Sequence, residues 1–533
     1  MIPLHVHSNN TFLQGTVPIN KLVDKAIEFR LNSLAITDTN SMHGIVQFTK
    51  LAKEKGLKPI IGSTIDQPEN PNEYIILLAK NNKGYSDLCK IITSRKLNED
   101  FSLTHLLNDN LDNFFIITSS IEIIKNIKAR ENVFIELIAS KKEKANNRKR
   151  YQFAKENYCE VVVTNPIYFL NKQDYLLHKT VTAIRLKTNI DNLTNEEIVD
   201  QEYYFKDPRQ IEDEWKNLPE ALVNSNRIAN ECNVDLKLNE YKFPVYSTPE
   251  NISAETMLWN ESFKGLEKRF NPITNKAKDR LEMELSVISE MGFSNYFLIV
   301  WDIINEAKRR GMMTIGRGSA ANSLVAYCLQ ITQIDPLEHN LYFERFLNKA
   351  RSSPPDFDID FSWKERDEII KYIFEKYGYE RVAMISTTVT FRARSAFREV
   401  AKAFGFTNEE ISKFSRKIPW TDAVNLPHLA ELFPESKGLN FKMEPWKTIV
   451  SIASQIARFP RHISIHPGGI VITPTKITDY VALEYAKNKG LGLIVTQPDM
   501  YSIEDLGLIK IDILSQRSLG VLRDTMESIR NKD

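Results

Sequence analysis

Residues 355–361 read PDFDIDF and alternate between aspartate and large apolar side chains. Successive side chains of a β-strand point to opposite faces, so this alternation predicts a strand whose acidic face carries Asp356, Asp358 and Asp360. Carboxylates in such a row lie about 6–7 Å apart, close enough to share a pair of divalent cations, and hard oxygen ligands favour Mg²⁺. Without a cation, like charges on one face destabilise a strand. A solvated acidic strand and a loop of acidic turns are the alternatives.

A second motif, GRGSAANS at residues 316–323, precedes an apolar stretch rich in alanine and leucine. Glycines followed by a serine predict a loop that opens a helix, with Ser319 at the helix start. The free N–H groups and positive dipole end of a helix bind phosphate, and the guanidinium of Arg317 adds charge-assisted hydrogen bonds. A Gly-Ser loop without a ligand is the alternative. A phosphate site on Arg317, Gly318 and Ser319, followed by an acidic strand, predicts a nucleotidyl-transfer site.

The apolar run at residues 506–514 supplies a further carboxylate. One lysine and Asp512 interrupt this predicted strand. A buried carboxylate costs several kcal/mol unless it is paired or bound to a metal, so Asp512 is a candidate third acidic ligand.

Basic residues provide candidates for DNA contact. Arg394 and Arg398 share one face of a predicted helix, one turn apart, where they contact a phosphate backbone or form structural salt bridges. His466 lies in a glycine-containing stretch suited to positioning phosphates. The basic run at residues 141–150 is either a solvated face or a DNA contact.

Overall charge neither favours nor excludes nucleic acid, because 70 lysines and arginines face 69 aspartates and glutamates. Any DNA contact therefore has to come from local patches. The 4 cysteines lie far apart without a C-x-x-C pair, which indicates a reducing compartment and argues against a disulfide framework or a zinc site. The sequence shows no signal-peptide pattern and no apolar run of membrane-spanning length. We expect a soluble, cytoplasmic protein.

The first 235 residues alternate short apolar strands with helical stretches. Examples of the strands are residues 33–37, 58–62, 74–78, 114–118 and 161–164. This rhythm predicts an α/β domain with a largely parallel sheet or a barrel. His5 and His7 at the end of the first strand, with Asp38 at the end of the second, are candidate metal ligands; ordinary polar strand residues are the alternative.

Residues 316–361, with DPL at 335–337 and FERFLN at 343–348, resemble the palm of bacterial replicative DNA polymerases of the C family, the DNA polymerase III alpha subunits. Residues 280–302 resemble the segment that precedes this palm. The resemblance implies a polymerase-β-like nucleotidyltransferase palm in which three aspartates hold two Mg²⁺ ions. Mapped onto this sequence, they are Asp356, Asp358 and Asp512, and the role of Asp360 stays open. Residues 459–472 resemble the R-H-x-S-x-H-x-x-G signature of these polymerases and lean toward their error-prone branch.

The N-terminal part resembles the PHP domain (polymerase and histidinol phosphatase), a distorted barrel at the front of such polymerases. Active members bind a metal cluster there, and this sequence keeps only part of the ligand set: His5, His7 and Asp38. Positions where the family has further ligands hold Thr39, Thr64, Pro166 and Tyr168. Hydroxyl, proline and phenol side chains do not replace carboxylate and imidazole ligands. The resemblance therefore implies a scaffold with a vestigial metal site.

These interpretations predict an α/β multidomain chain. It contains a PHP-like distorted (β/α) barrel at 1–240, a polymerase-β-like palm at 241–386 and 467–533, and a helical thumb at 387–466. The implied function is that of a DNA-directed DNA polymerase, using two Mg²⁺ ions, primer–template DNA and dNTP in replication or translesion repair.

The family carries a fingers domain and further modules after its third aspartate, whereas this sequence stops soon after Asp512. We therefore expect a chain truncated after the palm, with a separately encoded fingers or C-terminal fragment and the sliding clamp as partners. The alternatives are a non-catalytic or split polymerase module that needs a partner and, less favoured, a PHP phosphoesterase.

Overall fold

The computed structural model describes residues 1–127, 131–349, 355–486 and 494–530. The chain divides into two compact units, each assembled from separate stretches of sequence. Unit 1 comprises Met1–Leu236, Thr388–Ser464 and a short piece around β11 (Leu483–Tyr485). Unit 2 comprises Lys237–Thr387, Ile465–Tyr480 and the part from β12 (Ile494–Asp499) to α20 (Arg517–Arg530). Most of the predicted thumb segment thus groups with the N-terminal part, and the predicted domain boundaries stay predictions.

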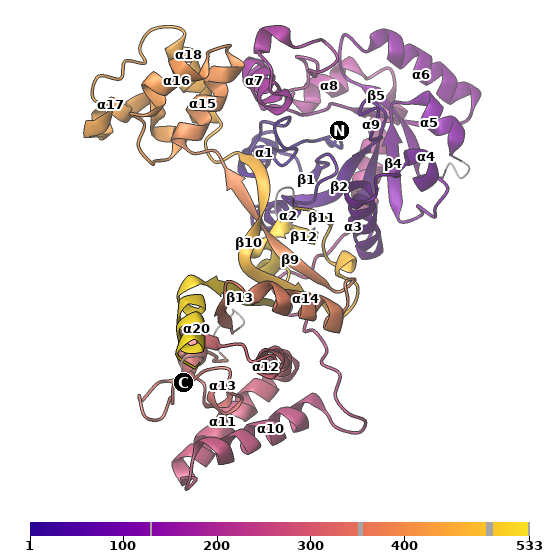
Figure 1. Ribbon diagram of the computed structural model, residues 1–533. Coiled ribbons are helices and arrows are strands. Elements are labelled where there is room, and N and C mark those ends of the chain that lie inside the picture. The colour runs from indigo at the N-terminus through magenta and orange to yellow at the C-terminus, as the bar shows by residue number, and fades with distance from the viewer. Residues whose placement is uncertain (128–130, 350–354, 487–493, 531–533) are drawn as a thin grey trace. The chain divides into compact units, whose positions relative to one another are not determined.

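The N-terminal part of unit 1, drawn from indigo to magenta in Figure 1, contains a sheet of six strands in sequential order. The strands are β1 (Ser33–Ile36), β2 (Lys58–Asp66), β3 (Tyr74–Ala79), β4 (Phe114–Thr118), β5 (Val133–Ile138) and β6 (Glu160–Thr164). The helices are α1 (Ile19–Glu28), α2 (Ile45–Glu54), α3 (Asn82–Leu97), α4 (Leu103–Leu106), α5 (Ile121–Asn126), α6 (Lys144–Glu156), α7 (Tyr175–Leu186), α8 (Pro208–Glu214) and α9 (Pro219–Glu231). The sheet is mixed, because β3 runs antiparallel to both of its neighbours while the other pairs are parallel.

The first residues of the chain join the two edges of this sheet. Thr37, directly after β1, donates its backbone N–H to the carbonyl oxygen of Val6 at 2.8 Å. On the other side His7 donates to the carbonyl oxygen of Ile167, which follows β6, also at 2.8 Å. Because β1 and β6 are the opposite ends of the strand order, this segment curls the sheet toward a barrel. The predicted α/β multidomain fold class is confirmed.

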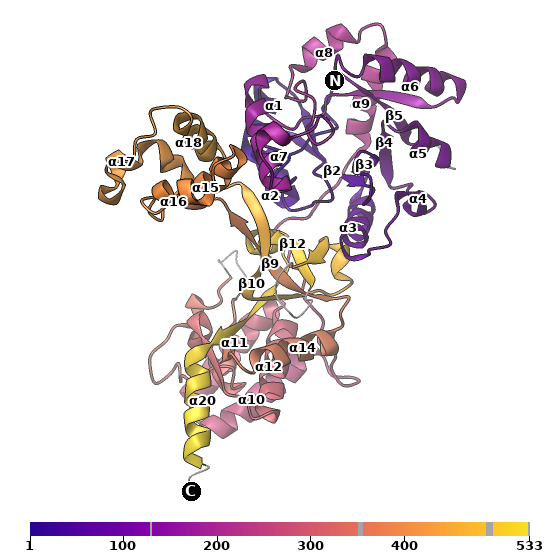
Figure 2. The ribbon, with the colours of Figure 1, turned by 45° about the horizontal axis from the view of Figure 1, so that its top comes forward.

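The second part of unit 1 is a cluster of short helices (Figure 2). They are α15 (Ala393–Ala403), α16 (Asn408–Ser415), α17 (Leu429–Leu432) and α18 (Trp446–Gln455). Aromatic rings fill the cluster, and the ring centroids of Phe414 and Trp446 lie 4.2 Å apart. Leu177 and Val181 of α7 belong to the same buried core, which explains why these helices form one unit with the N-terminal sheet.

Unit 2 is built around strands that lie in the order β12-β9-β10-β13-β8-β7. The strands not yet given are β7 (Thr314–Arg317), β8 (Asp358–Ser362), β9 (Val382–Thr390), β10 (Pro460–Ile472) and β13 (Lys510–Gln516). Its helices are α10 (Ala254–Arg269), α11 (Asn275–Glu290), α12 (Ser294–Arg309), α13 (Leu324–Cys328), α14 (Arg366–Tyr377), α19 (Met500–Asp505) and α20. Helix α12 buries an apolar face, and its Phe297 contacts Phe357, the residue just before β8, with ring centroids 5.1 Å apart.

Within the described residues, no single helix has the length and apolarity that a membrane span requires. Helices α11 and α12 meet these criteria only when taken together, and they join at a bend of 114°.

Candidate active site

Neighbouring strands of unit 2 gather three aspartates. β8 and β13 run parallel, and their register places Asp512 directly opposite Asp358. Asp356 comes two residues before Asp358, and the backbone N–H of Asp512 donates to the carbonyl oxygen of Phe357 at 3.1 Å. One carboxylate oxygen from each of the three aspartates lies within 4.8 Å of the others. We call this set the acidic triad: Asp356, Asp358 and Asp512.

Apolar side chains fix the direction in which these carboxylates point. Phe357, Ile359 and Phe361 are completely buried on the opposite face of the same segment. The ring of Phe357 lies 5.3 Å from that of Tyr296 and 5.2 Å from that of Phe346. Burying such side chains favours folding by roughly 1.5–3 kcal/mol each, so the alternating pattern orients the aspartates away from the core. Strand β8 itself begins at Asp358, and Asp356 lies just before it.

A lysine that the sequence prediction left without a role lies between two of the carboxylates. Lys510 Nζ is 2.9 Å from Asp512 Oδ2 and 3.2 Å from Asp356 Oδ2. Burial lowers the pKa of Lys510, but the hydrogen bond with Asp512 and the charges of Asp356 and Asp512 outweigh it, and the net shift is upward. The pKa of Asp358 is raised, chiefly by burial and then by the charges of Asp356 and Asp512. The signal for Lys510 was its position two residues before Asp512, on the same strand face.

The acidic triad fits a divalent cation. Asp356 Oδ1 and Asp512 Oδ1 are buried and make no hydrogen bond among the described residues. Buried carboxylate oxygens without partners are costly, and a hard cation ligated by oxygen removes this cost.

Asp360, on the same strand, has different partners. Arg317 Nε lies 3.2 Å from its Oδ1, and Gln516 donates to the same oxygen at 3.3 Å. Asp360 is therefore not part of the group of carboxylates that converges in the acidic triad.

The glycine loop after β7 reaches the acidic triad. Gly318 has a φ of +72°, which favours glycine, and a Cβ added there would lie 3.3 Å from Asp358 Oδ2. Arg317 ends β7 opposite Asp358 in an antiparallel pairing. The predicted residues Arg317 and Gly318 thus lie beside the carboxylates, and Ser319 follows in a short 3₁₀ turn, Gly318–Asn322.

The predicted helix start is wrong. Helix α13 begins at Leu324, and Ser323, not Ser319, caps it by accepting the N–H of Ala326. The buried carboxylate of Glu284 accepts from the Ser323 hydroxyl at 2.8 Å and from the Val325 N–H at 3.1 Å. Because a protein carboxylate already occupies this helix start, a phosphate has to use the backbone of the preceding turn.

His466 of β10 lies next to the acidic triad. Its Nδ1 accepts the N–H of Gly469 at 2.8 Å and is 3.6 Å from Asp512 Oδ1. Burial lowers the pKa of His466, and the lone pair of Nδ1 is already used, so the contact with Asp512 is not an ion pair. Its assignment to DNA binding stays a prediction.

The two predicted DNA-binding arginines lie in unit 1, on α15. Arg394 donates through Nε and Nη2 to the carbonyl oxygen of Ile418, at 3.2 and 2.6 Å. Arg398 donates to Ser415 Oγ and Asn408 Oδ1, both at 3.2 Å. Each guanidinium thus has a structural role, and contact with a phosphate has to use its remaining N–H groups.

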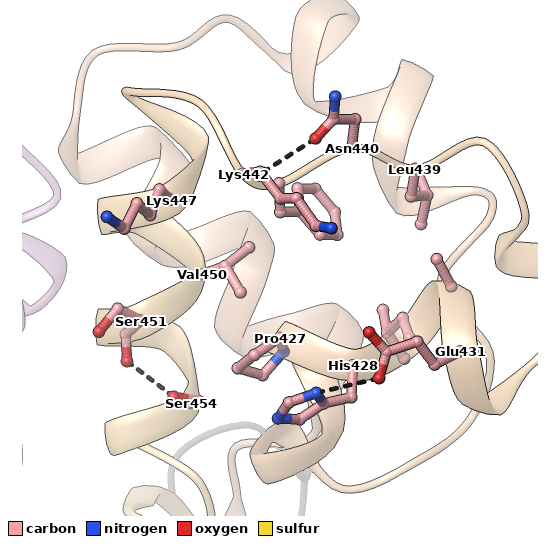
Figure 3. A pocket seen from close by; sticks show the side chains of 13 residues that line it. Pro427, His428, Glu431, Leu439, Asn440, Lys442, Lys447, Val450, Ser451 and Ser454 are labelled. Carbon is pink, nitrogen blue, oxygen red and sulfur yellow. Dashed lines mark hydrogen bonds and ion pairs between the residues drawn. The ribbon is translucent and has the colours of Figure 1, made fainter.

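A pocket of about 270 Å³ lies elsewhere in these helices (Figure 3). Its polar rim contains Lys442, Lys447 and the pair His428–Glu431, whose Nδ1 and Oε2 are 3.3 Å apart. Neither Arg394 nor Arg398 lines it.

The candidate metal residues of the N-terminal sheet, His5, His7 and Asp38, are buried and have polar partners in the protein. His5 Nε2 lies 3.0 Å from His7 Nε2, and Asp38 accepts hydrogen bonds from the Ser8 N–H and hydroxyl and from the Thr11 hydroxyl, at 2.6–2.7 Å.

Glu136 of β5 belongs to this network and was missed from the sequence. Its Oε1 lies 2.7 Å from His5 Nδ1, and its Oε2 accepts from the Tyr74 hydroxyl at 2.8 Å. The signal was a single carboxylate inside the apolar run at residues 133–138. Tyr168 stacks on His7 with ring centroids 4.1 Å apart, so a phenol ring stands beside this histidine.

Comparisons with known proteins match two parts of the chain. The model of the bacterial DNA polymerase III alpha NTPase domain matches residues 256–515, and the model of the PHP domain matches residues 3–161. The chain carries a bacterial DNA polymerase III alpha NTPase domain and a PHP domain. Both the acidic triad and the glycine loop lie within the first match.

Curated relatives match nearly the whole of this chain. An error-prone DNA polymerase from Symbiobacterium thermophilum is 31% identical, over 100% of this chain and 52% of the relative. The DNA polymerase III alpha subunit of Halalkalibacterium halodurans is 34% identical, over 99% of this chain and 49% of the relative. The DNA polymerase III alpha subunit of Bacillus subtilis is 32% identical, over 100% of this chain and 50% of the relative. The chain spans about half the length of the curated relatives it matches.

Among solved structures, a metal-dependent phosphoesterase from Bifidobacterium adolescentis aligns with a TM-score of 0.23 and 11% identity. The alignment covers 31% of this chain and 86% of that one.

Proposed function

We propose that this chain holds the nucleotidyl-transfer site of a DNA-directed DNA polymerase. The reaction adds a nucleotide from dNTP to a primer 3′-OH on template DNA, in replication or translesion repair in the cytoplasm. One observation carries the proposal: Asp356, Asp358 and Asp512 converge within 4.8 Å beside the glycine loop, although they come from distant segments. The names of the relatives support the same activity.

The residues of the chain have separate tasks in this proposal. Asp356, Asp358 and Asp512 would hold two Mg²⁺ ions, whose positive charge would activate the 3′-OH and stabilise the pyrophosphate leaving group. Arg317 and Gly318 lie beside Asp358, so they and Ser319 are placed to bind the triphosphate. Of these, Arg317 keeps about half of its side chain exposed, and its fork suits bidentate contact with phosphate oxygens.

Contacts with primer–template DNA are assigned to Arg394, Arg398 and His466, through the donors that their structural hydrogen bonds leave unused. The PHP part is proposed to act as a scaffold. The buried contacts of His5, His7, Asp38 and Glu136 support this, because His5 contacts Glu136 and His7, and Asp38 accepts hydrogen bonds from Ser8 and Thr11. A PHP phosphoesterase activity is therefore disfavoured.

A second candidate function is a polymerase module that is active only with a further polypeptide. The chain spans about half the length of the relatives whose names support the first candidate. The partner would supply what the other half of the relatives supplies, including fingers and contacts with the sliding clamp.

Primer extension tests both candidates. The purified chain is incubated with labelled primer–template DNA, dNTPs and Mg²⁺, alone and with a polypeptide corresponding to the second half of a relative. Extension that requires Asp358 and Asp512 supports the proposal, and a requirement for the added polypeptide selects the module. The matched control is Asp524→Asn, an exposed aspartate of α20 paired with Lys364. Extension that survives both Asp358→Asn and Asp512→Asn would refute the assignment.

A further inference from the structure

Lys510 makes close contacts with two members of the acidic triad at once. Its Nζ lies 2.9 Å from Asp512 Oδ2 and 3.2 Å from Asp356 Oδ2, and a third carboxylate oxygen, Glu504 Oε1, is 3.9 Å away. The side chain is 13% exposed, so water screens these contacts only weakly. An ammonium in this position is a buried cation bound by the same groups that fit a metal.

The backbone holds Lys510 in place. It begins β13, and Asp512 follows two residues later on the same face of the strand. The hydroxyl of Tyr296, a completely buried residue of α12, donates to the carbonyl oxygen of Lys510 at 2.9 Å. The ammonium can change direction, but its Cα cannot move away from the acidic triad without breaking this contact.

Charge balance at the acidic triad depends on this lysine. Three carboxylates lie within 4.8 Å of one another and repel when ionised. The nearby guanidinium of Arg317 contacts Asp360 at 3.2 Å, whereas Lys510 contacts the acidic triad directly. The ammonium therefore reduces the repulsion among the carboxylates, and by the same Coulomb interaction it opposes a divalent cation bound to them.

We propose that Lys510 is the internal counter-cation of the acidic triad: it holds Asp356 and Asp512 together and lowers the affinity of the triad for a divalent cation. This inference rests on the metal site of the proposed function. Lys510 is a positioning residue here, because it acts through the carboxylates.

A competing role predicts the opposite result. If Lys510 mainly oriented Asp356 and Asp512 for the metal, removing it would weaken metal binding. Losing the orientation of a side chain costs a factor of roughly ten or less, whereas a unit charge at about 4 Å in a partly buried site changes an equilibrium by more than that. The charge effect is therefore expected to dominate, and neutral variants should bind a divalent cation about tenfold or more tightly.

The experiment compares the full chain carrying Lys510→Met or Lys510→Gln with the wild type. Mn²⁺ affinity is measured by electron paramagnetic resonance, and thermal stability is measured in EDTA and across a Mn²⁺ series. The matched control is Lys364→Met, which removes an exposed ion pair of 2.7 Å to Asp524 in the same unit. We expect both Lys510 variants to be less stable than wild type in EDTA, to bind Mn²⁺ more tightly, and to regain stability when it is added. The control should keep wild-type affinity.

Unchanged or weaker Mn²⁺ binding by both Lys510 variants overturns the inference, as does a Lys510→Met chain that stays unfolded at saturating Mn²⁺. Failure of the proposed metal site has a separate signature: either the wild type binds no Mn²⁺, or Asp358→Asn binds it as tightly as the wild type does. Tight binding by the wild type together with equal binding by Lys510→Met rejects only the role of the lysine.

Discussion

Asp512 of β13 stands directly opposite Asp358 of β8, although four strands, β9 to β12, lie between them along the chain. The buried residues Phe357, Ile359 and Ile513 fix this register, since a slip of one position would turn every side chain to the other face. The convergence of two carboxylates thus follows from the burial of apolar side chains, and the acidic triad forms although its like charges repel one another.

Replacing Asp358 with asparagine should separate stability from activity. Burial and the charges of Asp356 and Asp512 raise the pKa of Asp358, so the ionised carboxylate is unfavourable in the folded protein at neutral pH. We expect Asp358→Asn to be at least as stable as wild type in EDTA while nucleotide incorporation falls about a hundredfold or more. Chemical denaturation and primer extension measure the two effects. A variant that unfolds in EDTA would contradict this account.

Asp360→Asn distinguishes the acidic triad from its neighbour. Asp360 contacts Arg317 and Gln516 and does not join the three converging carboxylates. Mn²⁺ affinity should therefore stay within about twofold of wild type, since no ligand is lost. The KM for dNTP should change more than the affinity for Mn²⁺, because Arg317 loses its partner. A loss of Mn²⁺ binding as large as that of Asp358→Asn would make Asp360 a ligand.

Gly469→Ala tests the packing behind the acidic triad. Gly469 pairs with Asp512, and a Cβ there would lie 2.8 Å from His466 Nδ1 and 3.0 Å from Ile385 Cδ1. We expect a loss of roughly 1–3 kcal/mol of stability, from a shift of β10 or of the imidazole. Mn²⁺ affinity should fall as well, since β10 supports Asp512. Wild-type values in urea denaturation and Mn²⁺ titration would show that the strand accommodates the methyl group.

Alanine should destabilise the protein strongly at Glu284 and very little at Ser319. Glu284→Ala leaves Arg280 and the start of α13 without their buried partner, and we expect a loss of about 3–5 kcal/mol. Asn322 donates to the carbonyl oxygen of Ser319, a contact that alanine keeps, so Ser319→Ala should change stability by about 0.5 kcal/mol or less and raise the KM for dNTP several-fold. Equal stability of the two variants would contradict the assignment of Glu284 to the helix start.

Glu484 should make the stability of unit 1 dependent on pH. Burial raises its pKa, but contacts with His43 at 3.3 Å and Lys96 at 3.4 Å outweigh this and lower the pKa to about 2. A folded-state pKa below the unfolded value gives stability that is complete above about pH 4.3 and is lost as the pH falls toward 2. Glu484→Gln should therefore destabilise the chain at pH 7 and much less at pH 3. The exposed pair Glu122–Lys125 offers the control Glu122→Gln, which should have little effect at either pH.

Local sequence patterns predicted those parts of the site that depend on strand periodicity. The alternation at residues 355–361 placed Phe357 in the core and Asp358 on the other face, as the structure shows. It did not distinguish Asp360 from the other aspartates, because its partner Gln516 lies far along the chain. The sequence shows Lys510 two residues before Asp512, but the contact of Lys510 with Asp356 depends on the pairing of β8 with β13.

The helix start after β7 shows where local reasoning fails. Ser319 and Ser323 both follow the glycines and both precede an apolar run, so local preferences do not choose between them. The choice depends on Glu284, which a distant helix brings to the start of α13. Glu136 is a different case, because a lone carboxylate in an apolar strand is the same signal that identified Asp512.

Anomalous diffraction from Mn²⁺-soaked crystals tests the acidic triad most directly. The account predicts anomalous density within about 2.5 Å of carboxylate oxygens from Asp356, Asp358 and Asp512, since manganese prefers oxygen ligands at short distance. The density should be absent from crystals of Asp358→Asn. Density that contacts none of these carboxylates, or no density at a Mn²⁺ concentration that supports primer extension, would contradict the central claim.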